Sequence, residues 1–239
     1  MTAILKVAQQ TEPFYPSADG EPVAETYDHL YCLLTTLEVL RQYLAPRQAT
    51  VLGNQFLYYA QGFPKLRVAP DVMVIFDVPP GGRDNYKIWE EGQVPSVIFE
   101  MTSPGTKDND QILKKTLYEQ LGVQEYWLFD PKGEWIEEKL RGYRLRGESY
   151  ELIGESRSEP LELRLQVEEK LIGFYRQDTG EKLLLPDELA QALRQEVIAR
   201  QQAEERADQE SQRAEQAELE VQKLKEKLRS LGVDPDTLQ

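Results

Sequence analysis

Two apolar stretches organise this chain: PDVMVIF at residues 70–76 and VIFEM at residues 97–101. Short apolar runs bounded by proline and glycine are typical of buried β-strands. A connection rich in proline and glycine, residues 77–96, separates the two runs. If the strands pair antiparallel, the start of the first lies beside the end of the second, and Asp71 and Glu100 approach each other at one edge.

This pair of acids indicates a metal site. Glu100 interrupts an apolar run, and burying a charge is costly unless the charge is paired or bound to a metal. Asp71 by itself is typical of a residue that starts a strand. Magnesium takes oxygen ligands and is commonly held by one or two carboxylates plus phosphate and water. We therefore expect Asp71, Glu100 and the backbone carbonyl of Met101 to bind Mg²⁺ or Mn²⁺ for phosphodiester chemistry.

A helix expected at residues 108–121 follows the second strand after a short turn at residues 103–106, and Gly122 is a natural end for it. Asp110, Lys114 and Tyr118 are spaced to share one face of this helix. Because the turn is short, we expect Lys114 to reach back toward Glu100, where it would orient a water or stabilise charge on phosphoryl oxygens. The alternative is an ordinary surface lysine, like its neighbour Lys115.

The remaining pattern indicates a mixed α/β class. Leucines at helical spacing predict a helix within residues 21–44, ended by Pro46. Residues 51–59 are strand-like, with a possible turn at Gly53-Asn54. Further strands are expected at residues 125–130, 135–140, 142–146, 150–153, 161–165 and 171–175. The order of helix, strands, helix and strands favours a mixed sheet flanked by helices over a repeating βαβ array. Three parts are predicted: an extended arm (1–20), the α/β body (21–185), and a long C-terminal helix with a short tail (186–239).

The C-terminal segment carries a heptad seam, in which steps of four and three residues alternate. Its ends are Leu and Val, whereas its middle is Ala with three charges. The seam positions are Leu189, Leu193, Glu196, Arg200, Ala203, Ala207, Glu210, Ala214, Ala217, Val221, Leu224, Leu228 and Leu231. Two interpretations stay open: a solvated single helix, and a coiled coil that forms a homo-oligomer. The apolar stripe at residues 221–231 favours the second.

Composition narrows the function classes. The net charge of −14 argues against an open, non-specific nucleic-acid binder, but a metal can neutralise a scissile phosphate locally. The single cysteine, Cys32, cannot form an internal disulfide, and the first residues lack the pattern of a secretory signal, so we expect a cytoplasmic protein. No apolar run approaches the roughly 20 residues needed to span a bilayer, so we expect no membrane association.

Residues 70–127 carry a more specific combination. Pro70-Asp71, Glu100, Ser103-Pro104, Asp110-Lys114-Tyr118 and the segment GVQEYW at residues 122–127 resemble the Uma-type family of predicted restriction endonucleases, within the PD-(D/E)XK nuclease superfamily. The resemblance covers roughly residues 20–185. It implies a restriction-endonuclease-like core and Mg²⁺-dependent cleavage of DNA, with Asp71 and Glu100 as the metal-binding acids.

One position departs from the superfamily pattern. The signature places a lysine two residues after the second acid, where this chain has Thr102. Lys114 is therefore the lysine that the resemblance carries over. The resemblance also implies an additional acid on the first helix, with Glu25 and Glu38 as candidates. Glu25 is preferred because it lies nearer the helix start.

Three further side chains need a choice between function and structure. Asp110 is an accessory candidate for the site. His29, the only histidine, is either a base or ligand near the metal or a partly buried helix residue, and we favour the second. The aromatic residues of the 125–130 strand are expected in the core rather than as a base-stacking platform.

The sequence thus predicts a metal-dependent endonuclease that hydrolyses DNA phosphodiester bonds. The alternative is a catalytically inactive nuclease fold that acts as a scaffold through its C-terminal helix in protein–protein interaction. The acidic net charge, Thr102 in place of the signature lysine and the long C-terminal segment motivate this alternative.

Overall fold

The computed structural model describes residues 13–20, 25–103, 105–106 and 108–232. Of the arm expected at residues 1–20, only residues 13–20 fall within this range, and the tail after Gly232 and Pro104 of the expected turn lie outside it. Contacts divide the chain into two units, Met1–Pro186 and Asp187–Gln239, and each is described by itself.

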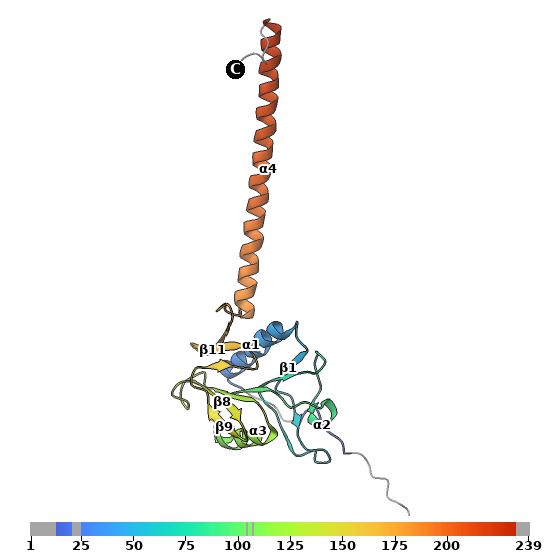
Figure 1. Ribbon diagram of the computed structural model, residues 1–239, viewed down its shortest axis with the longest axis vertical. Helices are drawn as coiled ribbons and strands as arrows, with labels where there is room; N and C mark the ends of the chain where they lie inside the picture. The colour runs from blue at the N-terminus through green and yellow to red at the C-terminus, as the bar shows by residue number, and fades with distance from the viewer. Residues whose placement is uncertain (1–12, 21–24, 104, 107, 233–239) are drawn as a thin grey trace, which may run out of the picture. The chain divides into compact units, whose positions relative to one another are not determined.

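A six-stranded mixed sheet forms the centre of the first unit (Figure 1). Its order is β1 (Ala49–Gly53), β4 (Val72–Phe76), β6 (Val97–Met101), β7 (Glu125–Phe129), β8 (Leu140–Arg146) and β9 (Ser149–Leu152). Only β6 and β7 run parallel; the other neighbouring pairs are antiparallel. Parallel neighbours require a crossover. Here it contains the π-helical turn η1 (Asn109–Lys114) and α3 (Lys115–Leu121).

The expected antiparallel pairing of the two carboxylate strands is confirmed. Val72 of β4 is opposite Phe99 of β6, and Val74 is opposite Val97. The same register, continued by one residue, sets Asp71 opposite Glu100. Alternation along both strands sends Val72 and Phe99 to one face of the sheet, and Met73 and Ile98 to the other.

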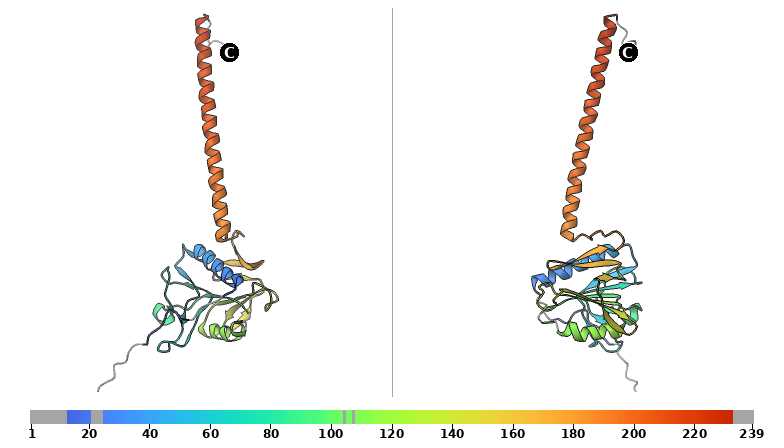
Figure 2. Two further views of the ribbon diagram at one scale, coloured as in Figure 1. Left: turned by 180° about the vertical axis from the view of Figure 1, so that it is seen from behind. Right: turned by 60° about the vertical axis from the view of Figure 1, so that its left-hand side comes forward.

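Different helices and strands pack on the two faces of the central sheet. This arrangement confirms the expected mixed α/β class. Helix α1 (Tyr27–Leu44) packs on the Phe99 face together with the three-stranded sheet of β10 (Arg157–Ser158), β11 (Leu163–Glu168) and β12 (Leu171–Arg176). Helix α3 covers the opposite face, which also receives the small sheet of β2 (Leu57–Tyr58), β3 (Arg67–Val68) and β5 (Tyr86–Lys87). The helix α2 (Ile88–Glu91) follows β5. Figure 2 shows α1 and α3 on opposite sides of the sheet.

One strand prediction was wrong, and another is refined. The strand-like segment 51–59 divides after Gly53, at the possible turn, into β1 and β2, which belong to different sheets. Residues 135–139 form no strand, because the buried carboxylate of Asp130 folds this segment into a loop. It accepts backbone N–H groups from Lys132 (3.1 Å), Gly133 (2.9 Å), Trp135 (2.5 Å) and Ile136 (3.0 Å).

The helix α4 (Pro186–Ser230) begins at the last residue of the first unit, Pro186, and otherwise lies in the second unit. Proline suits the first turn of a helix, where its missing N–H would have no intrahelical partner. No residue of this 45-residue helix is buried. Among the helices described, none is both long enough and apolar enough to cross a membrane.

Candidate active site

Asp71 and Glu100 meet where β4 starts and β6 ends. Asp71 Oδ2 accepts the backbone N–H of Met101 at 2.6 Å, and the Asp71 N–H lies 3.4 Å from Glu100 Oε2. The antiparallel register brings these groups together, and the two contacts tie the acidic side chains to the opposite strand. The two carboxylates are therefore held by backbone geometry rather than by flexible loops.

Glu100 lies in a nearly closed environment. Its side chain is 1% exposed, Tyr118 OH donates to Oε1 at 2.8 Å, and Lys114 Nζ lies 2.9 Å from Oε2. Burial disfavours the charged carboxylate, and the nearby Asp71 and Asp110 carboxylates add repulsion. Together these effects raise the pKa of Glu100 to about 8, although Lys114 opposes them.

Lys114 bridges two buried acids. Its ammonium also lies 3.0 Å from Asp110 Oδ1, and the Asp110 side chain is 1% exposed. Although burial opposes the charged ammonium, the carboxylates of Glu100 and Asp110 raise the pKa of Lys114 above its usual value. Lys114 therefore keeps its positive charge at neutral pH.

His29 lies closer to the site than we predicted. Its ring is buried, and Nε2 is 3.5 Å from both Asp71 Oδ1 and Glu25 Oε2. Neither ring nitrogen has a hydrogen-bond partner among the described residues. Burial opposes protonation, but Asp71 and Glu25 outweigh it and raise the pKa of His29. The leucine spacing of α1 shows the inward face only in part, since Leu30 and Leu34 are exposed. It gives no sign that the N-terminal turn of the helix lies against Asp71.

Of the two acids proposed for the first helix, only one lies near Asp71. Glu25 precedes α1 and shares His29 with Asp71. Glu38 instead lies on the outer side of α1, with Arg41 at 3.5 Å and Gln42 at 3.1 Å. The structure thus brings Glu25, and not Glu38, to the acidic cluster. This cluster comprises Glu25, His29, Asp71, Glu100, Asp110 and Lys114.

The donor chemistry of this cluster fits a hard divalent cation. Four acids lie around one lysine and one histidine, so carboxylates outnumber the cationic side chains in the cluster. No group of three or more His, Cys, Asp or Glu side chains within the described ranges is arranged to hold a metal by itself. Magnesium seldom needs such a cage, since it keeps water ligands and completes its shell with phosphate. The two carboxylates of Asp71 and Glu100 match the number of protein ligands that this mode of binding uses.

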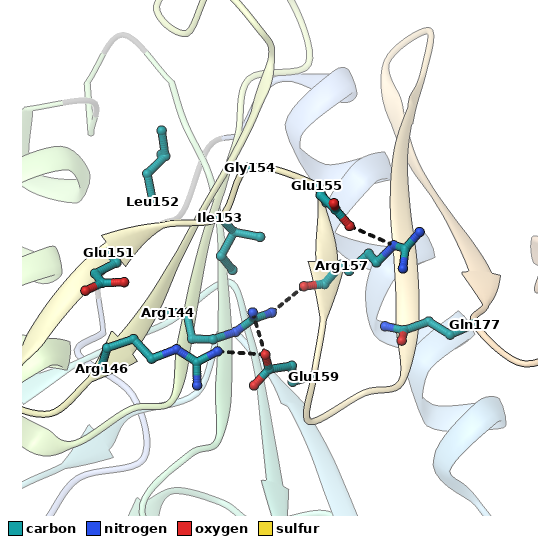
Figure 3. Close-up of a pocket in the computed structure, with 10 residues that line it drawn as sticks. All are labelled: Arg144, Arg146, Glu151, Leu152, Ile153, Gly154, Glu155, Arg157, Glu159 and Gln177. Atoms are coloured by element: carbon teal, nitrogen blue, oxygen red, sulfur yellow. Dashed lines mark hydrogen bonds and ion pairs between the residues drawn. The ribbon is translucent and has the colours of Figure 1, made fainter.

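A separate pocket beside β8, β9 and β10 contains arginines but is a weaker candidate (Figure 3). Arg144 contacts Glu125 and Glu159, each at 2.7 Å, and Arg146 also contacts Glu159 at 2.7 Å. Arg157 lies 3.4 Å from Glu155. Because carboxylates already neutralise these guanidinium groups, the pocket offers an anion little uncompensated charge.

Comparisons with known proteins assign the chain to a family. The model of the Uma2 family, described as "Putative restriction endonuclease", matches residues 3–172. Among solved structures, a crystal structure of "a putative nuclease belonging to DUF820" from Anabaena variabilis is similar. It shares 19% sequence identity at a TM-score of 0.41, and the match covers 59% of this chain and 77% of that chain. No curated protein matches the chain.

Proposed function

This chain belongs to the Uma2 family, described as "Putative restriction endonuclease", and we propose that it is a divalent-metal-dependent endonuclease that hydrolyses DNA phosphodiester bonds. One observation carries the proposal. The carboxylates of Asp71 and Glu100 lie side by side on antiparallel strands, and the Lys114 ammonium lies 2.9 Å from Glu100.

Asp71 and Glu100, with the backbone carbonyl of Met101, would hold Mg²⁺ or Mn²⁺. A bound cation of this kind polarises the phosphate and lowers the pKa of a water molecule. Glu100 has a pKa of about 8 without the cation, so proton and cation compete for its carboxylate near neutral pH. We therefore expect metal affinity to rise as the pH approaches that value.

Lys114 serves as a fixed cation in this proposal. Since its pKa is raised, it does not act as a general base. Its ammonium instead neutralises the charge that gathers on phosphoryl oxygens in the transition state. Asp110 and Glu100 hold the ammonium from two sides, while Tyr118 fixes the other oxygen of Glu100.

The direct test is cleavage of supercoiled plasmid DNA by the full-length protein with Mg²⁺ or Mn²⁺. Substituting a residue that only orients a metal ligand typically lowers metal affinity or activity about 10–100-fold. Replacing a ligand itself should have a larger effect, so Asp71→Asn and Glu100→Gln should each lower the cleavage rate by at least about 100-fold. Asp178→Asn is the matched control, since this exposed carboxylate pairs with Arg176. Equal behaviour of the wild type and both site variants with either metal would contradict the proposal.

The inactive scaffold is the alternative, and one observation favours it: Lys114 and Tyr118 already occupy both oxygens of Glu100. Calorimetric titration with Mn²⁺ separates the two functions. The endonuclease requires a cation-binding event that Glu100→Gln weakens, whereas absence of binding to the wild type supports the scaffold.

A further inference from the structure

Helix α4 exposes large apolar side chains near both of its ends. Leu189 is 43% exposed, Leu193 60%, Val221 51% and Leu224 57%. These four residues lie on the heptad seam, whose spacing places them on one side of the helix. Most of the stability of a helix in a protein comes from packing of such a face against another element.

A second copy of α4 is the simplest complement, and the seam allows two orientations. In a parallel pair in register, each seam residue faces itself. Glu196, Arg200 and Glu210 would then each face an identical charge at the centre of the interface. Like charges held together away from water are strongly unfavourable.

In a parallel pair, the ion pairs at the solvent-exposed edges of the interface add too little stability to offset the three like-charge contacts. Arg213 would face Glu218 of the second copy, and Glu220 would face Lys225. Ion pairs at such exposed positions contribute little to stability and are screened by salt.

An antiparallel pair over the whole helix removes all three like-charge layers. Leu189 then faces Leu228 of the second copy, and Leu193 faces Leu224, so the two apolar ends cover each other. Ala203 faces Ala214 in the middle, where small side chains allow close approach of the two backbones.

The charged seam residues also find suitable neighbours in this register. Glu196 faces Val221 of the second copy, Arg200 faces Ala217, and Glu210 faces Ala207. Each long charged side chain can lay its aliphatic part over a small or apolar residue and keep its charge in water. The remaining cost is at the rim, where Arg206 flanks Arg213 of the second copy.

We propose that α4 is the dimerisation element of this protein and that it pairs antiparallel with α4 of a second copy, with Leu189 beside Leu228. A helix of 45 residues is about 67 Å long. The two Pro186 residues, where the bodies attach, therefore lie at opposite ends of the paired helices. This proposal is independent of the nuclease activity.

Orientation is tested by cross-linking full-length Leu189→Cys and Leu228→Cys variants with a short bis-maleimide. Burial raises the pKa of the native Cys32 thiol to about 12, so it does not compete for the reagent. The antiparallel pair predicts that a mixture of the two variants, one carrying an affinity tag, yields cross-linked heterodimers, while each variant alone yields few. Self-cross-linking of each variant would overturn the orientation.

The oligomeric state is tested by light scattering on full-length protein. Wild type should have twice the mass of one chain, and Leu224→Glu should be a monomer. Leu219→Glu is the matched control, because Leu219 is equally exposed, at 56%, but lies outside the seam. A monomeric or higher-order wild type overturns the proposal, as does a monomeric Leu219→Glu variant.

Discussion

The ammonium of Lys114 lies 2.9 Å from Glu100 Oε2, although the two residues come from different elements, the end of η1 and strand β6. The same ammonium contacts the buried Asp110 carboxylate, so one cation serves two acids. Burial is the main cause of the raised pKa of Glu100, and the neighbouring Asp71 and Asp110 carboxylates add to it. The proposed divalent cation would add positive charge to this cluster.

Removing the charge of Lys114 should destabilise the fold. Lys114→Met leaves the buried Asp110 carboxylate without its cation and removes the donor to Glu100 Oε2, and breaking a buried ion pair from one side costs about 3 kcal/mol or more. Urea unfolding at neutral pH measures the loss. Lys132→Met, at an exposed lysine, should change the unfolding free energy by less than about 0.5 kcal/mol. Equal effects of the two substitutions would show that the buried pairing has no energetic role.

The hydroxyl of Tyr118 should matter for the fold and for the cation. Tyr118→Phe removes the donor to Glu100 Oε1 and should cost about 1–2 kcal/mol. It also disfavours the ionised form of Glu100, so Mn²⁺ affinity measured by calorimetry should fall. Tyr150→Phe is the control, since its hydroxyl donates to the Val123 carbonyl at 2.9 Å. The control should lose stability but keep its Mn²⁺ affinity; equal loss of affinity in both variants would contradict this role.

Glu100 should make stability depend on pH in the absence of metal. Its pKa is about 8 when folded against an ordinary value of 4.5, so the folded state holds the proton more tightly. The associated stability is complete below 4.5 and is lost as the pH rises through about 8. The free energy of unfolding, measured in EDTA, should therefore fall more between about pH 5 and about pH 9 for wild type than for Glu100→Gln. An equal decrease in unfolding free energy in the two proteins would show that Glu100 does not cause the pH dependence.

Glu25 and Glu38 provide a matched pair on the first helical segment. Glu25 shares His29 with Asp71, whereas Glu38 contacts only surface partners among the interactions described. Glu25→Gln should reduce plasmid cleavage by about 10-fold, the effect of removing a group that orients a metal ligand. Glu38→Gln should cleave at the wild-type rate. A greater loss for Glu38→Gln would reverse the assignment.

Gly142 tests the packing of the central sheet away from the acids. A methyl group at this position on β8 would overlap the indole ring of Trp127 on the neighbouring β7. Gly142→Ala should therefore destabilise the protein by about 1–3 kcal/mol in urea unfolding. Gly154→Ala has no atom within 4 Å of its new methyl group and should unfold like wild type. A wild-type midpoint for Gly142→Ala would mean that the sheet relaxes freely around the ring.

Much of the fold and the meeting of three polar residues could be predicted from local patterns. The apolar runs around Asp71 and Glu100 predicted two paired strands, and antiparallel pairing alone brings their opposite ends together. The short turn after β6 then predicted that Lys114 returns toward Glu100, and the distance of 2.9 Å agrees. These features depend on neighbours in sequence or on one strand pair, so residue spacing contains the necessary information.

Contacts between distant segments were decided by the tertiary structure. The amphipathic pattern of α1 determined that the helix packs inward, but only the packing of α1 over the sheet brings His29 and Glu25 to Asp71. The segment after Asp130 has the composition of a strand, yet one buried carboxylate satisfies its backbone N–H groups and folds it as a loop. Periodicity reports which side of an element is buried. It does not report which remote side chain meets it, because that depends on how whole elements pack.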